Sequence, residues 1–452
     1  MTVVPAKERN MGVKAEAPTT RLERPCAFVW MQVNVDYRGT VRPCCHVNDA
    51  GAFGNLNERS LMEIWNGEAW QRLRRAWVAG DLSGTPCEGC KVVAVEGAPI
   101  AWEFPVRSGS ENSPASANQA LALAEMQSGA IVQLAKPVVL QYFPSTLCNI
   151  DCTFCFQWDQ KGIKLGAKGM EMVTQLMPTL MRIDWIGGEP TVQQDFRRWL
   201  SDLDIDANPN LNVGMVSNGT ILDTALVKLF ERISGFVSVS LDAVDKALYE
   251  DIRAGAVWED TRRNVETYRA ISRSNPGFRL YVSCLLQKKN LAHLPDFLSF
   301  CLEREIPAKV YPSESFPLFE RLDMFDDPAS ELPENWEEVF ERTLVLARAL
   351  DAVQPNNCES TVHYCRAAVM RGLERHRDSR RVRLSPSPGS TGRMVVAYAA
   401  GAAIAYARVS GGEDMSIALP NTLPTASVRF YLHGDDRGTD RAPPLQPLAE
   451  EG

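Results

Sequence analysis

The sequence has no long apolar run and no excess of positive charge. No stretch approaches the roughly 18 uninterrupted apolar residues that mark a membrane span, and residues 1–10 carry no apolar core of an export signal. The formal net charge is −8, whereas proteins that bind nucleic acid usually present a basic face. We therefore expect a cytoplasmic protein with no membrane and no nucleic acid among its partners.

Cysteine is the residue whose distribution is informative. The chain has 12 Cys in 452 residues. Without an export signal, these thiols are expected to stay reduced or to bind metal. Cysteines that lie in tight groups favour metal binding. The groups in this chain are Cys44 with Cys45, Cys87 with Cys90, and the trio Cys148, Cys152 and Cys155, and Cys26 lies upstream of the first group. The scattered thiols are expected to be ordinary buried residues, namely Cys284, Cys301, Cys358 and Cys365.

The length of the chain allows two to three domains. Composition and periodicity predict a flexible arm over 1–24, a small α+β unit over 25–100, a linker and helix over 101–136, a core domain over 137–320, a helical extension over 321–376 and a low-complexity or partly disordered tail over 377–452. We find no convincing periodic element in the tail.

The first unit combines a hairpin, a helical run and four separated thiols. Val33 and Val35 alternate with polar residues before a turn at Gly39, which predicts a β-hairpin. Tryptophans at helical spacing over 65–77 predict a packed core. Thiols at Cys26, Cys44, Cys87 and Cys90 can surround a metal, and both zinc and an iron–sulfur cluster fit four thiolates.

From residue 137 the chain alternates between strand-like and helix-like segments, as βα units around a parallel sheet do. The predicted strands are 138–142, 183–186, 213–216, 236–241, 280–285 and 308–311. In parallel α/β architectures, ligands bind beyond the carboxyl ends of the strands. The polar motifs of this segment follow those ends.

The first such motif sets Cys148, Cys152 and Cys155 in the pattern CxxxCxxC. Zinc sites and ordinary iron–sulfur clusters take four protein ligands, and no fourth Cys or His lies close in sequence. A metal bound here would keep an open position, where a substrate or cofactor can dock. The alternative is a chance group of buried or zinc-binding cysteines.

The trio, with Phe154 before its last Cys, resembles the cluster loop of radical S-adenosylmethionine (SAM) enzymes. The resemblance implies a [4Fe–4S] cluster on Cys148, Cys152 and Cys155, with the fourth iron chelated by SAM. It also implies reductive cleavage of SAM to a 5′-deoxyadenosyl radical, which abstracts hydrogen from a substrate, and an external electron donor such as flavodoxin or ferredoxin.

Four later segments match further motifs of that family. Gly187-Gly188-Glu189-Pro190 is similar to its GGEP motif, which implies contact with the SAM amino group. Asn218 lies in a segment resembling Thr-Asn-Gly, and Ser240 and Asp242 resemble its ribose-binding Ser-x-Asp. Arg253 matches an Arg near the SAM carboxylate, although a surface salt bridge with neighbouring Glu250 or Asp251 is the alternative.

The N-terminal unit resembles the SPASM and Twitch auxiliary-cluster modules of the same enzymes. The resemblance rests on Cys26, Gly39, Cys44, Gly54-Asn55-Leu56, 64–67 and Cys87-x-x-Cys90. Four Cys match the shorter Twitch form, which implies a second [4Fe–4S] cluster ligated entirely by protein. Cys45 leaves the second ligand ambiguous, and the module precedes the core instead of following it.

The fold class implied is α/β, a partial (β/α)6 TIM-like barrel with a small N-terminal α+β cluster-binding module. The function implied is radical SAM chemistry that oxidises, cross-links or epimerises a peptide or a small sugar or cyclitol, with the auxiliary cluster accepting an electron. An epimerase needs a hydrogen donor; Cys45 and Cys284 are candidate thiols, but we expect both to be buried. The rival hypothesis is a non-catalytic metal-binding or interaction protein with structural Cys sites.

Overall fold

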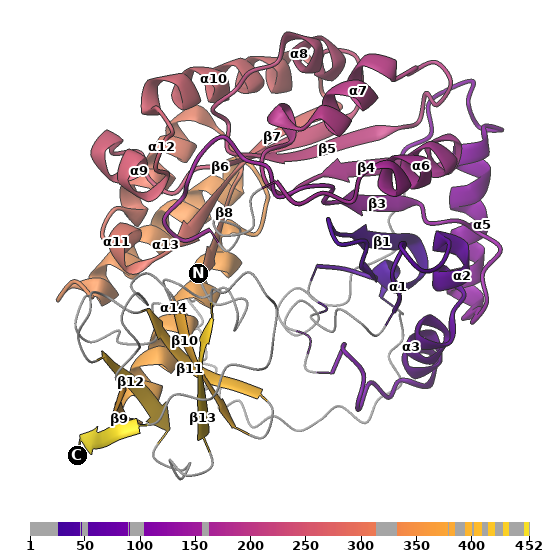
Figure 1. Cartoon of the computed structure of the whole chain (residues 1–452). Helices are drawn as coiled ribbons and strands as arrows, with labels where there is room; N and C mark the ends of the chain where they lie inside the picture. Colours follow the sequence, from indigo (N-terminus) through magenta and orange to yellow (C-terminus); the bar gives the residue numbers. More distant parts are fainter. Residues whose placement is uncertain are drawn as a thin grey trace, which may run out of the picture.

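The structure is a computed structural model (Figure 1). It describes residues 26–45, 47, 53–88, 90, 104–155, 162–312, 332–377, 379–384, 394–399, 402–408, 415–420, 428–433 and 447–451. Within these ranges, no helix is both long and apolar enough to cross a membrane.

An eight-stranded sheet forms the centre of the fold, in the order β2-β1-β3-β4-β5-β6-β7-β8. Its strands are β1 (Gln32–Val35), β2 (Val41–Arg42), β3 (Val139–Tyr142), β4 (Arg182–Trp185), β5 (Asn212–Ser217), β6 (Gly235–Ser240), β7 (Phe278–Leu286) and β8 (Ala308–Pro312). Neighbours from β1 to β8 are parallel, whereas β2 pairs with β1 in the antiparallel sense. The strands β3 to β8 lie where the sequence predicted them, and the α/β fold class is confirmed.

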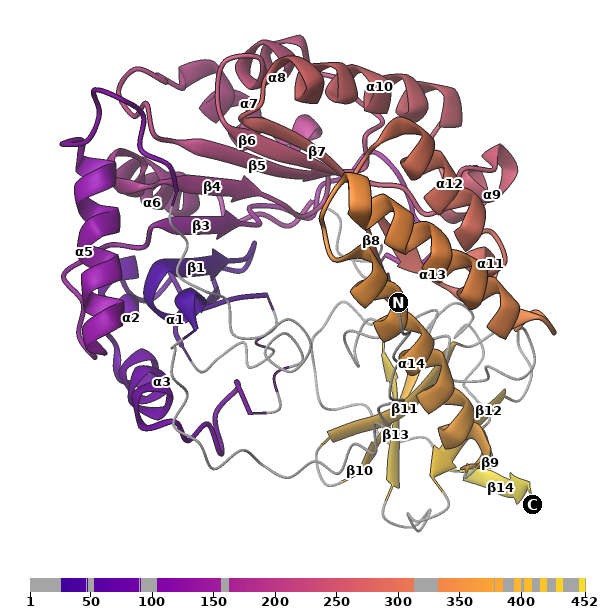
Figure 2. The same cartoon turned by 180° about the vertical axis from the view of Figure 1, so that it is seen from behind.

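The helices that connect these strands lie along the outer side of the curved sheet (Figures 1 and 2). They are α6 (Ala167–Leu176), α7 (Gln194–Asp202), α8 (Thr224–Phe230), α9 (Lys246–Ile252), α10 (Trp258–Ser274), α11 (Lys288–Leu291) and α12 (Leu294–Arg304), with 3₁₀ turns at Met177–Thr179 and Pro190–Val192. On β6, Val237 and Val239 are buried, whereas Ser238 and Ser240 are half-buried. Because side chains alternate across a strand, the valines pack beneath the helices and the serines face the inner side.

The N-terminal unit extends the sheet of the core. Its elements are α1 (Ala27–Met31), β1, β2, α2 (Leu61–Trp65) and α3 (Glu68–Ala79). The hairpin of β1 and β2 turns at Gly39, whose φ of 83° favours glycine, as predicted. Strand β1 also pairs with β3 in a parallel register from Gln32 opposite Val139 to Val35 opposite Tyr142. Backbone hydrogen bonding therefore joins this unit directly to the core.

Helix α3 packs against the segment before β3 through buried tryptophans and one buried arginine. Trp65 and Trp70 are fully buried, which confirms the predicted core. The guanidinium of Arg74 lies 4.5 Å from the Trp65 ring and donates to the carbonyl of Ile131 (3.0 Å) and to the Gln133 side chain (3.2 Å). Burial lowers the pKa of Arg74 to about 9. Arg74 thus links the helix to the chain that leads into the core.

Arg74→Met is expected to destabilise the protein by about 3 kcal/mol, because it leaves several buried acceptors without a donor. Urea unfolding followed by tryptophan fluorescence measures this loss. Arg75→Met is the matched control, since Arg75 is exposed on the same helix. Equal stability losses in the two variants would contradict the assigned role of Arg74.

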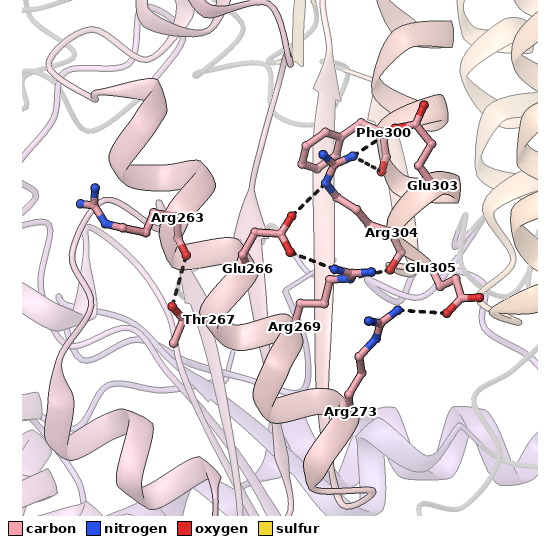
Figure 3. A network of polar contacts seen from close by, with 9 residues as sticks. All are labelled: Arg263, Glu266, Thr267, Arg269, Arg273, Phe300, Glu303, Arg304 and Glu305. Carbon is pink, nitrogen blue, oxygen red and sulfur yellow. Dashed lines mark hydrogen bonds and ion pairs between the residues drawn. The ribbon is translucent and has the colours of Figure 1, made fainter.

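A polar network holds α10 against α12 on the outer side of the sheet (Figure 3). Glu266 accepts hydrogen bonds from Arg269 (3.0 Å) and Arg304 (2.9 Å), and Arg269 also donates to the carbonyl oxygen of Arg304 (2.7 Å). Burial alone would raise the pKa of Glu266, but the hydrogen bonds from both arginines lower it overall. Arg269 thus supplies a hydrogen-bond donor for the carbonyl oxygen of Arg304, the last residue of α12, which has no partner within the helix.

Helices also lie at both ends of the core segment. Helix α5 (Pro114–Ser128) precedes β3 and is capped by Ser113, whose side chain accepts a hydrogen bond from Ser116 N. Helices α13 (Trp336–Val353) and α14 (Cys358–Arg377) follow β8. The helices predicted before and after the core are therefore present.

The last segment contains strands that the sequence analysis did not predict. They are β9 (Ser379–Leu384), β10 (Met394–Ala399), β11 (Ala402–Arg408), β12 (Met415–Pro420), β13 (Val428–His433) and β14 (Pro447–Glu451), arranged as β11-β10-β13 and β12-β9-β14. Several are rich in Val, Ile and Tyr, which favour strands. The abundance of Ala, Gly and Pro around them concealed this signal, and the expectation of no regular element is wrong for these residues.

Candidate active site

The Cys loop follows the end of β3 and is held by two neighbouring segments. Asp151 N donates to the carbonyl of Ala254 (2.7 Å), and Thr153 N donates to that of Ile252 (2.9 Å). On the other side, Glu189 N donates to the Leu147 carbonyl (2.8 Å). These backbone bonds place the loop at the carboxyl edge of the sheet, where the sequence analysis expected it.

The glycines of the GGEP motif allow this approach. Gly188 has φ of 44°, and a Cβ built there would collide with the Leu147 carbonyl oxygen. Gly187 has φ of 81° and leaves no room for a side chain beside the ring of Phe143. Both positions therefore require glycine for a structural reason.

Glu189 is buried and its carboxylate is already surrounded by donors. It accepts from Thr191 N (3.1 Å), Thr191 Oγ1 (2.8 Å), Ser217 Oγ (3.0 Å) and Asn218 N (2.7 Å). Burial raises the pKa of Glu189, although these hydrogen bonds act in the opposite direction. In this conformation Glu189 fixes the end of β5 relative to the Cys loop.

Asn218, directly after β5, faces the first thiol of the trio. Its Nδ2 lies 3.7 Å from Cys148 Sγ and 3.0 Å from Asn149 Oδ1. Its Oδ1 accepts from the backbone and side chain of Thr220 at 2.9 and 2.7 Å. The amide is therefore oriented with its donor toward the thiol.

Arg253 and Asp242 form a buried ion pair behind the second thiol. Arg253 Nη2 lies 2.8 Å from Asp242 Oδ2, and Arg253 Nη1 lies 3.7 Å from Cys152 Sγ. Burial raises the pKa of Asp242, and Arg253 counteracts this effect. The alternative of a surface salt bridge between Arg253 and Glu250 or Asp251 is wrong, because Arg253 is buried and points toward the Cys loop.

Asp242→Asn is expected to cost about 3 kcal/mol of stability, because it leaves the charge of Arg253 buried without its counter-ion. The neutral side chain can still accept from Leu285 N, which donates to Asp242 at 2.8 Å. Asp251→Asn is the control, since Asp251 pairs with Lys289 at the exposed surface. Chemical denaturation should separate the two variants, and a stable Asp242→Asn protein would contradict the assignment.

The remaining predicted residues lie around this centre. Phe154 packs under Arg253, with its ring centroid 5.6 Å from the guanidinium carbon. Ser240 is half-buried at the end of β6 on the inner side of the sheet. The sequence analysis assigned no role to Thr191, Ser217 and Thr220, which orient Glu189 and Asn218. Their proximity to GGEP and to Asn218 was the only signal.

The thiols of the trio are partly exposed. Burial raises the pKa of Cys152 to about 12, while Arg253 acts to lower it. Among the described residues, no group of three or more His, Cys, Asp or Glu side chains is arranged to hold a metal ion. An iron–sulfur cluster differs from one ion because separate irons take separate thiolates. Three thiols on one loop, two of them beside hydrogen-bond donors, fit such a cluster by their chemistry.

The N-terminal unit carries the four further thiols that the sequence predicts as ligands. Burial raises the pKa of Cys26 to about 12, and Cys87 and Cys90 contribute in the same direction. Burial also raises the pKa of Cys87, to about 11. Cys44 is buried. These four thiols have the donor chemistry for a second cluster.

Cys45 differs from the prediction, whereas the scattered cysteines agree with it. Cys45 is exposed, so its expected burial is wrong. It interacts electrostatically with Cys90, and the choice between Cys44 and Cys45 as a ligand therefore stays open. The ordinary buried thiols are confirmed, namely Cys284, Cys301, Cys358 and Cys365. Cys284 lies 3.8 Å from the carbonyl oxygen of Asp242.

Two protein-family models match the chain. The model of the SPASM iron-sulfur cluster-binding domain matches residues 26–91, and that of the Radical SAM superfamily matches residues 142–301. The first covers the N-terminal thiols, and the second covers the trio, GGEP, Asn218, Asp242 and Arg253.

Curated relatives match over parts of their length. They include a PqqA peptide cyclase of Xanthomonas euvesicatoria pv. vesicatoria (43% identical over 76 residues, 16% of this chain and 19% of that protein), a probable GTP 3′,8-cyclase of Sulfurisphaera tokodaii (27% over 164 residues, 35% and 50%) and molybdenum cofactor biosynthesis protein 1 of Drosophila melanogaster (26% over 173 residues, 36% and 29%). The chain thus spans half or less of the length of these relatives.

Solved structures also resemble the chain, at low similarity. SuiB of Streptococcus suis is 15% identical, with a TM-score of 0.35 over 58% of this chain and 57% of SuiB. Native anSMEcpe with bound AdoMet is 16% identical, with a TM-score of 0.34 over 47% of this chain and 60% of that protein.

Proposed function

Because the chain belongs to the radical SAM superfamily and carries a SPASM iron–sulfur module before the core, we propose that it is an enzyme that cleaves SAM reductively at a [4Fe–4S] cluster held by Cys148, Cys152 and Cys155. When bound, the cluster and SAM supply a 5′-deoxyadenosyl radical that abstracts hydrogen from a substrate. One observation carries the proposal. The side chains of Asn218 and Arg253, which follow neighbouring strands of the sheet, donate hydrogen bonds to the sulfurs of Cys148 and Cys152.

The residues of the chain divide into those that face the cofactors and those that support them. Gly187 and Gly188 give the backbone close access to the Cys loop, and Phe154 and Ser240 lie beside the proposed SAM site. Glu189 and Asp242 have buried, hydrogen-bonded carboxylates. We therefore assign these two carboxylates a supporting role for the site in the described conformation.

The N-terminal thiols are proposed to hold the auxiliary [4Fe–4S] cluster, with Cys26, Cys87, Cys90 and either Cys44 or Cys45 as ligands. Strand β1 fixes this unit to the edge of β3, the strand that leads into the Cys loop. A cluster held there would supply an acceptor for an electron from a substrate radical, and an external donor such as flavodoxin or ferredoxin would supply the electron for SAM cleavage.

A peptide is the substrate class we propose. Local similarity to a peptide cyclase supports it, and the reaction class is oxidation, cross-linking or epimerisation of the bound peptide. A small sugar or cyclitol is the competing class, and product analysis by mass spectrometry with each class of substrate separates them.

The test is anaerobic incubation of the iron-reconstituted protein with SAM and dithionite. We expect about eight irons per chain, as two four-iron clusters require, SAM binding by equilibrium dialysis, and formation of 5′-deoxyadenosine. Protein that holds its full iron and yet neither binds nor cleaves SAM would overturn the proposal. It would favour a structural role for the metal sites.

A further inference from the structure

Two side chains outside the Cys loop donate hydrogen bonds to two of its thiols. We propose that Asn218 and Arg253 are positioning residues that set the reduction potential of the SAM-binding cluster, through hydrogen bonds to the sulfurs of Cys148 and Cys152. The inference rests on the proposed function, because it requires these thiols to be cluster ligands. It assigns Arg253 to the cluster sulfur, whereas the sequence resemblance placed Arg253 at the SAM carboxylate.

The amide of Asn218 has one orientation available. Its Oδ1 accepts from Thr220 N at 2.9 Å, and a backbone N–H cannot reverse its role. Rotating the amide would place its NH₂ group against that N–H. Asn218 N donates to Glu189 Oε2 at 2.7 Å, which also fixes the backbone. The NH₂ group, whose two hydrogens serve Asn149 Oδ1 at 3.0 Å and Cys148 Sγ at 3.7 Å, therefore stays on the side of the thiol.

Arg253 is held on both its side chain and its backbone. One terminal nitrogen is 2.8 Å from Asp242, and the other is 3.7 Å from Cys152 Sγ. The residues on either side of Arg253 accept hydrogen bonds from Asp151 N and Thr153 N, which flank Cys152. The planar guanidinium thus bridges a buried carboxylate and a thiol across a fixed distance.

These contacts favour the reduced cluster. Reduction adds one electron, supplied here by dithionite, and part of the added negative charge resides on the ligand sulfurs. Hydrogen bonds to the sulfurs stabilise that charge and are a main determinant of iron–sulfur potentials. A donor that carries a positive charge, such as Arg253, acts more strongly than a neutral amide. Removing either donor should make the cluster harder to reduce.

The variants are Asn218→Ala and Arg253→Lys, with Asn208→Ala as the control. Lysine keeps a cation beside Asp242, but its single ammonium group lacks the fork that reaches Cys152. Asn208 is buried like Asn218, but it donates to the carbonyls of Met177 and Leu180 instead of a thiol. Iron content is measured first, and the midpoint potential is then determined by an EPR-monitored redox titration without SAM. The relevant signal is the one that changes when SAM is later added.

Both variants are expected to hold wild-type iron and to show an about tenfold lower ratio of reduced to oxidised cluster at a given potential, which is a negative shift of about 59 mV for one electron. Asn208→Ala should titrate like the wild type. Iron-loaded variants with unchanged midpoints would overturn this inference alone, as would an Arg253→Lys protein that only binds SAM more weakly. A wild-type chain without a SAM-responsive cluster would overturn the proposed function as well.

Discussion

Cys148→Ser, Cys152→Ser and Cys155→Ser are each expected to lose 5′-deoxyadenosine formation by more than about 100-fold. Changing a hydrogen-bond partner of a metal ligand already costs about 10–100-fold, and loss of a ligand removes an iron–protein bond. The loop offers no replacement, because no other Cys or His occurs between Pro144 and Cys155. Anaerobic assay of 5′-deoxyadenosine by chromatography measures the effect.

Cys301→Ser provides the matched control, because Cys301 is buried in α12, away from the Cys loop in sequence, and is not among the predicted ligands. It should retain SAM cleavage. Iron analysis should show about four irons fewer in each loop variant than in the wild type. Retained cleavage in any loop variant would show that its thiol is not a required ligand.

The sequence was sufficient to predict elements whose signals are local. The strands β3 to β8 carry apolar runs followed by polar motifs, and the tryptophans of α2 and α3 repeat at helical spacing, so burial could be predicted without tertiary information. The turn at Gly39 was similarly marked by its residue type. The position of the Cys loop followed from the rule that loops after parallel strands meet at one edge.

The partners of the site residues could not be predicted in the same way. Glu189 is linked to Asn218 across 29 positions, and Arg253 is linked to Cys152 across 101 positions. Such contacts depend on how the strand ends are placed relative to one another, and a local sequence pattern carries no information on that placement. For that reason the sequence offered only a neighbouring Glu and Asp as protein partners of Arg253, as the alternative to a place near the SAM carboxylate, although the fold directs it inward to Asp242.

The same limitation applies to the N-terminal unit. Its hairpin was predictable, but the parallel pairing of β1 with β3 joins residues more than 100 positions apart. This pairing bears on function, because it makes the thiol-bearing unit a continuation of the core sheet. A rigid connection of this kind would keep an auxiliary cluster at a constant distance from the Cys loop.

The double variant Cys87→Ala with Cys90→Ala is expected to cleave SAM near the wild-type rate but to yield no oxidised product. These thiols lie in the N-terminal unit and not on the Cys loop, so the SAM-binding cluster should remain intact. In the proposed function the auxiliary cluster is the electron acceptor, so its loss should leave the substrate radical unoxidised. The measurements are 5′-deoxyadenosine by chromatography and product by mass spectrometry in the same reaction.

Cys358→Ala controls for the loss of a buried thiol, since Cys358 lies at the start of α14 and is not a predicted ligand. It should form both 5′-deoxyadenosine and product. Full product formation by the double variant would contradict the role of electron acceptor. Loss of SAM cleavage as well would contradict the independence of the two thiol groups, and it would indicate that the unit containing β1 supports the Cys loop through its pairing with β3.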